Sequence, residues 1–395
     1  MNPEARIVTR IGDEELDRRW SSVRGAMRAR GWDALVIQNA NDWLGGYVKW
    51  FTDIPATNGY PRTIVFPISG AMTVVEMGPF DHQRELNEAD RLHRGAARLV
   101  TTPSFPSINY TNNYDAEIVV DALAGCRMVG WINPGALPCG LVSHVEKALR
   151  PKTVFADATE EVDQIKATKS PAEIALIRQA ASLQDRVFAK VLDFVRPGLR
   201  DIDVTAFAQH EALTLGSEQG IFLGASAPVG VRSPFMPRWA QGRTLEAGDH
   251  LSLLIEVNGP GGFYTEIART IILGRASSEL RAAFQSVKDA QDYTLSLIRP
   301  GAMPAAIHAA HNRWMQDHSL PPETRLYAHG QGYDMVERPL IRQDETMPLA
   351  ENMCLAVHPG YETASLFGVI CDNYLVGSDG PSECLHRTEK KLFEI

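Results

Sequence analysis

Residues 251–273 read LSLLIEVNGPGGFYTEIARTIIL, and this stretch predicts a buried β-hairpin. The first arm is apolar on both faces, and the sequence Asn-Gly-Pro-Gly-Gly at 258–262 is typical of a turn. If the turn closes symmetrically, Glu256 lies opposite Tyr264. Because side chains alternate along a strand, Glu266 then shares that face, with the two carboxylates roughly 7–8 Å apart along a diagonal.

Burying two carboxylates on one face requires a proton, a cationic partner or a metal ion. The alternative interpretation places both glutamates on a solvated sheet edge, and the doubly apolar first arm argues against it. Glu256 and Glu266 are therefore candidate catalytic residues and candidate metal ligands. Tyr264, on the same face, is a candidate substrate-binding residue.

Further along the chain, residues 327–333 (YAHGQGY) place His329 in a glycine-rich segment. Glycines let the backbone approach a site closely, which favours a functional histidine. A single histidine is also commonly a hydrogen-bonded structural residue, so the residues alone leave both interpretations open.

Two short apolar segments near the C-terminus carry the remaining candidates. In residues 354–359 (CLAVHP), strand alternation places His358 on one defined face. In residues 368–376 (GVICDNYLV), Cys371 and Asp372 point to opposite faces, so only one of them can reach a shared site. The simpler interpretation of the aspartate is a carboxylate at a strand end that accepts backbone hydrogen bonds.

The chain divides into two predicted domains. Residues 1–160 alternate helix and strand patterns and predict a small α/β domain, and residues 161–395 form the second. The second domain begins with a capping box, Ser-Pro-Ala-Glu at 170–173. Within it, LDFVRPG ending at Gly198 recurs as LSLIRPG ending at Gly301. Each copy lies between helical patterns and precedes a strand pair, which predicts two α-α-β-β halves, unless RPG is only a common helix stop.

Composition excludes several classes of function. The 395 residues include 39 Lys+Arg and 48 Asp+Glu, a net charge of −9, with no basic cluster, which argues against nucleic-acid binding. No run of about 18 apolar residues predicts a membrane span. The first residues are polar and acidic, and the five cysteines are scattered, so we expect a reduced, cytoplasmic protein.

These features resemble, in this order, the creatinase/prolidase/methionine-aminopeptidase family, and the resemblance covers nearly the whole chain. Residues 165–180, Ile-Ala-Arg-Thr at 267–270 and the His-Gly pair at 329–330 resemble the family's linker and two of its motifs. The resemblance implies an α+β fold: a pita-bread catalytic domain of duplicated α-α-β-β halves, preceded by a smaller α/β creatinase-type N-terminal domain. It also implies a homodimer with shared active sites.

Metallopeptidases of this family hold two metal ions with two Asp, one His and two Glu. The resemblance places five positions of this chain at those ligands: Glu256, Glu266, His329, His358 and either Cys371 or Asp372. The hairpin carboxylates stand one residue closer together than usual, and His358 replaces a glutamate. That replacement removes negative charge that two divalent ions need. The set therefore implies one Zn, Fe or Mn ion, or a metal-free hydrogen-bonded network.

At other positions, the chain matches the family at one residue and departs from it at two. Glu337 matches the glutamate after the peptidase His-Gly loop and is a candidate acid or base, although it could instead pair with Arg338 at the surface. Two further histidines of the peptidases are missing here. Val336 stands at one position, and residues 230–243 (GVRSPFMPRWAQGR) offer no counterpart of the other.

The N-terminal domain adds a predicted loop, residues 41–52 (NDWLGGYVKWFT). In creatinase-like dimers this region reaches the partner's active site. Trp43, Trp50 and Phe51 are therefore candidates to wall a small substrate, and Lys49 is a candidate to pair with its carboxylate or phosphate. The alternative is that the aromatic residues are core or dimer contacts.

Three functions follow from these observations. The first is a hydrolase of a C–N bond in a small, polar, non-peptide substrate, with Glu256, Glu266 or Glu337 moving protons and His329 and His358 positioning the substrate or a single metal ion. The second is a metal-dependent Xaa-Pro dipeptidase or aminopeptidase. The third is a non-catalytic binding module on the same fold.

Overall fold

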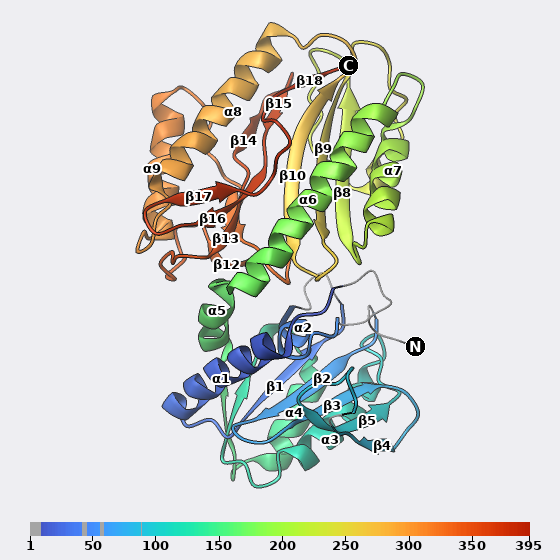
Figure 1. Cartoon of the computed structure of the whole chain (residues 1–395), viewed down its shortest axis with the longest axis vertical. Helices are drawn as coiled ribbons and strands as arrows, with labels where there is room; N and C mark the ends of the chain where they lie inside the picture. Colours follow the sequence, from blue (N-terminus) through green and yellow to red (C-terminus); the bar gives the residue numbers. More distant parts are fainter. Residues whose placement is uncertain (1–8, 42–45, 56–58, 88) are drawn as a thin grey trace. The chain divides into compact units, whose positions relative to one another are not determined.

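The computed structural model describes residues 9–41, 46–55, 59–87 and 89–395. Two compact units divide between Lys166 and Ala167 (Figure 1). The division falls later than residue 160 because helix α5 (Thr159–Ala167) runs on from the first unit across the predicted boundary.

The first unit contains a seven-stranded sheet of order β4-β5-β3-β2-β1-β6-β7. β2 and β3 pair antiparallel, and β1 pairs in parallel with β6. Apolar side chains of the central strands form the core with α3 and α4. The elements are β1 (Ala34–Asn39), β2 (Arg62–Pro67), β3 (Met72–Met77), β4 (His82–Glu85), β5 (Ala96–Thr102), β6 (Met128–Trp131), β7 (Val154–Asp157), α1 (Asp13–Arg30), α2 (Gly46–Thr52), α3 (Asn112–Ala122) and α4 (Cys139–Leu149).

One buried carboxylate in this unit makes its stability depend on pH. Asp115 of α3 is 2% exposed and accepts hydrogen bonds from Gln38 (3.0 Å) and Thr63 (2.8 Å), neither of which is charged. Burial raises the pKa of Asp115 to about 6. The folded state therefore binds a proton more tightly than the unfolded state, whose aspartate pKa is about 3.9. This group's contribution to stability falls as pH rises from about 4 to about 6.

We expect Asp115→Asn to raise the free energy of unfolding relative to wild type at pH 8, by up to about 3 kcal/mol. At pH 4 the gain should be near zero, because Asp115 is then protonated in wild type. Urea unfolding of both proteins at the two pH values measures the difference. Asp121→Asn on the same helix is the matched control, because Asp121 is exposed and paired with Arg98. A gain that does not change with pH would contradict the prediction.

The second unit repeats one arrangement of helices and strands. Its first half packs α6 (Pro171–Phe194) and α7 (Asp201–Thr214) on a sheet of order β18-β10-β9-β8, around an apolar core. The strands are β8 (Gly220–Ala227), β9 (His250–Asn258), β10 (Tyr264–Ile272) and β18 (Phe393–Glu394). The predicted capping box is confirmed: the Ser170 hydroxyl accepts from the Glu173 N–H at 3.2 Å, and the Glu173 carboxylate accepts from the Ser170 N–H at 2.7 Å.

The second half contains α8 (Ser278–Leu297), α9 (Pro304–Asp317) and a sheet of order β12-β11-β13-β16-β17 (Figure 1). A separate pair, β14 with β15, accompanies it. The predicted duplication of α-α-β-β halves is thus present. The strands are β11 (Ala328–Gly330), β12 (Glu337–Leu340), β13 (Cys354–Val357), β14 (Gly360–Glu362), β15 (Phe367–Val369), β16 (Asp372–Val376) and β17 (Pro381–Cys384).

The sheets of the two halves meet at one backbone bridge. Ala268 of β10 and Cys371, the residue before β16, exchange two backbone hydrogen bonds of 3.3 Å. This bridge places the middle of β10 beside the strands that carry the later candidate residues.

The predicted hairpin exists, but its predicted register is wrong. Glu256 pairs directly with Glu266, and Tyr264 pairs with Asn258 rather than with Glu256. The turn shifts by one residue because the Gly259 N–H bonds to the Phe263 carbonyl at 2.9 Å. The shift brings the two carboxylates directly opposite each other instead of along a diagonal.

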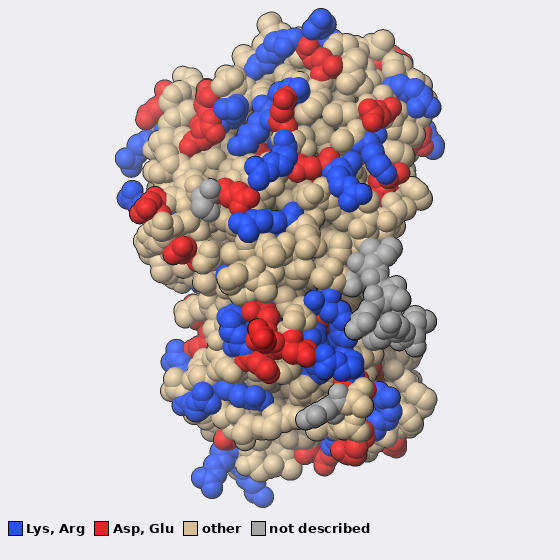
Figure 2. Space-filling view, in the orientation of Figure 1, with Lys and Arg blue, Asp and Glu red and all other residues tan. Residues whose placement is uncertain are grey.

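Among the described helices, none is both long and apolar enough to cross a membrane. On the face shown in Figure 2, basic and acidic side chains are interspersed. That face therefore shows no continuous basic surface of the kind that nucleic-acid binding needs.

Candidate active site

The site begins with the carboxylate pair on the hairpin. Glu256 of β9 is 6% exposed, and Glu266 of β10 is 4% exposed. The two side chains lie on the same face because their residues form a directly opposed pair in the ladder. At this depth both groups cannot be ionised together without a compensating charge.

Three residues of the second half surround Glu266. The Nε2 atoms of His329 and His358 each lie 3.7 Å from one of its carboxylate oxygens, and their rings meet edge-to-face with centroids 5.1 Å apart. The Cys371 thiol donates a hydrogen bond of 2.8 Å to Oε1 of the same carboxylate. The structure therefore brings Cys371 to the centre.

The surroundings set a distinct protonation state for each group. Burial, together with the neighbouring Glu266, raises the pKa of Glu256 well above its ordinary value. Burial also acts to raise the pKa of Glu266, but the two imidazoles and the hydrogen bonds from Cys371 and Glu256 outweigh it, so that this pKa is lowered. Burial lowers the pKa of His358 to about 4 and raises that of Cys371. The surroundings therefore favour the protonated form of Glu256 and the ionised form of Glu266.

The donor atoms fit a single metal ion. Ligand atoms of Glu266, His329 and His358 all lie within 4.8 Å of one another. Bonds of about 2.0–2.1 Å to one ion would hold such atoms roughly 3–4 Å apart. The Nδ1 of His329 lies 2.9 Å from the Gly330 carbonyl, which assigns the proton to Nδ1 and leaves the Nε2 lone pair facing Glu266. Within the described part of the chain, no second cluster of this kind accompanies it.

Two amide side chains complete the centre, and sequence reasoning missed both. Gln331 donates from Nε2 to Glu256 Oε1 at 2.9 Å and to the Met335 carbonyl at 3.0 Å. Its Oε1 accepts from Asn373 Nδ2 at 2.7 Å, and Asn373 Oδ1 accepts from the Glu266 N–H at 2.7 Å. This fully buried chain holds the carboxylate of Glu256 and the backbone of Glu266. The only sequence signal was that each amide lies two residues from a candidate, His329 or Cys371.

Comparison with known proteins identifies the family. The model for metallopeptidase family M24 matches residues 175–378, about half of the chain. The chain belongs to metallopeptidase family M24. The predicted family and pita-bread fold are thereby confirmed, as is the prediction of a hydrolase of this family.

Individual relatives have low sequence identity to this chain but align with it over long stretches. An uncharacterized peptidase, YqhT of Bacillus subtilis, is 26% identical over 238 residues, covering 59% of this chain and 66% of that protein. A Xaa-Pro dipeptidase of Pyrococcus horikoshii is 22% identical, covering 69% of this chain and 76% of that protein. The structure of an X-Pro aminopeptidase from Thermotoga maritima superposes with a TM-score of 0.76 at 16% identity, covering 95% and 99% of the two chains, which supports the fold.

In this M24 hydrolase, Glu337 lies outside the histidine cluster. Its carboxylate pairs with Lys169 at 2.8 Å, and both side chains are almost fully buried. It also accepts a hydrogen bond of 3.2 Å from the Asp334 N–H. The predicted surface pair with Arg338 is wrong, because Arg338 bonds to Glu345 instead. Since Glu337 is committed to a buried ion pair, the structure contradicts its prediction as a free acid or base.

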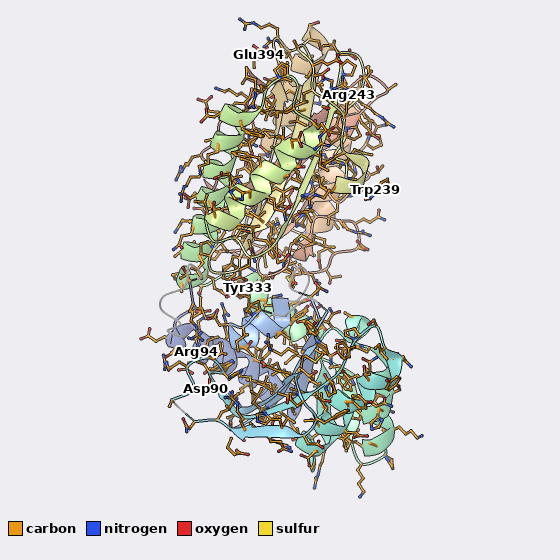
Figure 3. All side chains as sticks on the ribbon, turned by 90° about the vertical axis from the view of Figure 1, so that its right-hand side faces the viewer. Asp90, Arg94, Trp239, Arg243, Tyr333 and Glu394 are labelled. Carbon is orange, nitrogen blue, oxygen red and sulfur yellow. The ribbon has the colours of Figure 1, made fainter. Side chains whose placement is uncertain are left out.

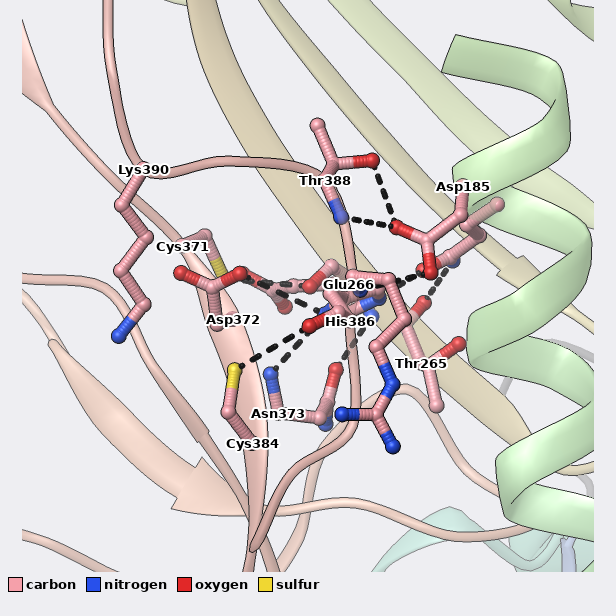
Figure 4. A network of polar contacts seen from close by, with 12 residues as sticks. Asp185, Thr265, Glu266, Cys371, Asp372, Asn373, Cys384, His386, Thr388 and Lys390 are labelled. Atoms are coloured by element: carbon pink, nitrogen blue, oxygen red, sulfur yellow. Dashed lines mark hydrogen bonds and ion pairs between the residues drawn. The ribbon is translucent and has the colours of Figure 1, made fainter. Parts of the chain in front are cut away.

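Asp372 is also turned away from the cluster, so its prediction as a metal ligand is wrong. It pairs with Arg269 at 2.7 Å, and neither side chain is exposed. Figure 4 shows Asp372 in a polar network that also contains His386 and Asn373. His386 Nδ1 lies 3.7 Å from the same carboxylate. The reason is strand alternation: Cys371 faces Glu266, and the next residue must face the opposite side.

The remaining predicted substrate contacts do not line an open site in their own units. Trp43 lies outside the described residues. Trp50 and Phe51 of α2 are 2% and 0% exposed and pack in the first unit, and Lys49 is buried beside them. Tyr264 is fully buried at the end of the hairpin. Burial favours the alternative of core residues for Trp50 and Phe51, and the substrate contacts stay a prediction.

Residues 230–243, which lack a counterpart of the second peptidase histidine, expose a tryptophan instead. Trp239, in a short helical turn at Arg238–Ala240, is 86% exposed (Figure 3). Val336, at the other missing histidine position, is also exposed. Neither side chain can exchange a proton, so these positions offer no acid or base.

Proposed function

We propose that this chain hydrolyses an amide C–N bond of a small substrate at the cluster of Glu256, Glu266, His329 and His358. The observation that carries the proposal is the geometry around Glu266. Two imidazole Nε2 atoms point at one carboxylate from 3.7 Å, which is too long for a hydrogen bond and suits one shared ion.

Glu266, His329 and His358 would hold that ion, and Zn or Fe suits a donor set of two imidazoles and one carboxylate. A divalent ion there would supply Lewis acidity toward the substrate carbonyl. A second ion lacks its ligands, because Asp372 faces away and the Cys371 thiol is a donor to Glu266. The charge argument from His358 leads to the same expectation of one ion at most.

The protein's own groups divide the proton transfers. Gln331 donates to Oε1 of Glu256, which assigns the proton of that carboxyl to Oε2. Glu256 can therefore release a proton to the leaving nitrogen and take one back from the attacking water, because its raised pKa favours the protonated form. Glu266 offers its ionised carboxylate to the ion that it would share with both histidines.

Two substrate classes compete for this centre. The likeness to the Pyrococcus horikoshii protein, a Xaa-Pro dipeptidase, favours dipeptides ending in proline. A non-peptide amide is favoured by one observation: His358 and Cys371 stand where the resemblance places carboxylates of the peptidases. In the second case the same residues could act without a metal, as creatinase-like acid–base groups.

The deciding experiment measures metal content and turnover on the same preparation. Protein purified without chelator or affinity nickel is assayed by elemental mass spectrometry per protomer. It is then tested on Xaa-Pro dipeptides and on small non-peptide amides, ureas and amidines, with and without chelator. We expect one Zn or Fe per chain and hydrolysis that chelator removes. Two ions per chain would overturn the single-ion centre, and no hydrolysis of any compound would overturn the enzymatic proposal.

The homodimer with shared active sites and the cytoplasmic location stay predictions. Light scattering coupled to size exclusion tests the first, since a monomer at assay concentration would contradict it. Fractionation of cells that express the chain tests the second.

A further inference from the structure

A pocket in the second unit lies beside the candidate active site. Its volume is about 370 Å³, enough for a small organic molecule. Phe235 and Phe367 form part of its wall, with ring centroids 5.2 Å apart. The other lining residues are Pro234, next to Phe235, and members of two further parts of the chain: Pro321, Pro322, Glu323, Thr324, Arg325, Gly360, Tyr361 and Glu362.

Arg325 is the cation that lines this pocket, and Glu323 fixes its position. Nε and Nη2 of the guanidinium donate to the two carboxylate oxygens of Glu323, at 3.0 and 2.5 Å. Glu323 is 4% exposed and is itself held by the Gly360 N–H at 3.2 Å. The arginine side chain is still 40% exposed. Among the described residues, no hydrogen-bond acceptor contacts its Nη1, which therefore presents two N–H groups from a fixed position.

The same arginine touches the catalytic cluster. Its Nη2 lies 3.3 Å from the carbonyl of His358, the most exposed member of the cluster. Gly360 makes this approach possible, because a Cβ there would lie 3.0 Å from Arg325 Nη2 and 2.7 Å from the Gly368 carbonyl. A group bound at Arg325 would therefore lie near the backbone of His358, one of the residues of the cluster.

The charged residues of the pocket determine which kind of chemical group it can bind. Glu323 is committed to Arg325, and Glu362 pairs with Arg232 at 3.0 Å. The open hydrogen-bonding capacity is thus that of the guanidinium, which matches carboxylate geometry, while the aromatic wall matches an apolar group.

We propose that this pocket binds a carboxylate of the substrate at Arg325, with an apolar part of the substrate against Phe235 and Phe367. The inference rests on the proposed function and narrows it. The substrates are small amides that carry a free carboxylate and an apolar group, and Arg325 determines this specificity.

The first test uses two probes that differ only in the carboxylate, N-acetyl-L-leucine and N-acetyl-L-leucinamide. Isothermal titration of the full chain should give at least about tenfold tighter binding of the acid. Equal affinities, or no detectable binding of the acid at millimolar concentration, would overturn the proposal. This comparison needs no variant.

The second test removes the guanidinium. Arg325→Gln should weaken binding of the acid about ten- to a hundredfold and leave the amide unchanged, and Arg325→Lys should recover part of the loss. Arg342→Gln is the matched control, because Arg342 also pairs with a carboxylate two residues away, Asp344, but does not line the pocket. If Arg325→Gln does not fold because Glu323 has lost its partner, the affinity of Arg325→Lys for the acid is compared with that of wild type instead. Wild-type affinity for the acid in a folded variant would overturn the proposal.

The two proposals fail in different ways. Hydrolysis of acid and amide substrates with the same kcat/KM would overturn the pocket's role and leave the proposed function standing. Selective binding of the acid without hydrolysis of any amide would overturn the proposed function and leave the carboxylate-binding role of the pocket standing.

Discussion

Glu266→Gln should lower kcat/KM by at least about a thousandfold on any substrate that the wild-type chain hydrolyses. Glu266 is the ionised member of the pair, and every other group of the centre is arranged around it. His329 and His358 face its two oxygens, and Cys371 donates to one of them. The amide removes the charge while keeping the shape of the side chain, so the loss reports on the charge itself.

The same substitution should weaken metal binding. A neutral amide is a poorer ligand than a carboxylate for a divalent ion, and we expect the affinity for Zn to fall at least about tenfold. Competition with a chromophoric chelator measures this without any substrate. Glu383→Gln is the matched control, because that glutamate pairs with Arg178 at the surface. A variant that keeps its turnover within tenfold of wild type would show that the reaction does not depend on this carboxylate.

The position of Glu266 illustrates what the sequence could predict. Apolar patterning and the glycine-rich turn were enough to place two carboxylates on one buried face of a hairpin. Register depends on one backbone hydrogen bond inside the turn, from Gly259 to Phe263, and the residue types do not specify it. The conclusion survived the error because the shift was one residue in each strand, which keeps Glu256 and Glu266 on a common face.

The other errors concern partners far apart in the chain. Glu337 is paired with Lys169, and no local pattern connects these residues. Alternation showed that Cys371 and Asp372 must diverge, but only the bridge between Ala268 and Cys371 decides which of them faces Glu266. Gln331 and Asn373 were missed because an uncharged amide carries no signal until its buried neighbours are known.

Arg269→Met should destabilise the second unit by about 3–5 kcal/mol, because it leaves Asp372 buried without its cationic partner. Neither side chain of the pair is exposed, and the guanidinium also donates to four backbone carbonyls. These carbonyls belong to Ala268, Cys371, Thr388 and Glu389, each 2.9 Å away. The substitution would remove one donor from each of them at the point where the two sheets meet, although the Ala268 and Cys371 carbonyls keep the hydrogen bonds of their bridge and the Glu389 carbonyl keeps the Lys391 N–H.

Urea unfolding of the variant measures this cost, with Arg178→Met as the matched control. Arg178 forms a half-exposed pair with Glu383, and its loss should cost less than about 1 kcal/mol. The double variant Arg269→Met with Asp372→Leu should recover part of the stability, since it removes the uncompensated charge as well. If Arg269→Met costs no more than the control, the pair does not hold the two sheets together. The position of Cys371 beside Glu266 must then depend on the backbone bridge with Ala268 and on the hydrogen bond from its thiol to Glu266.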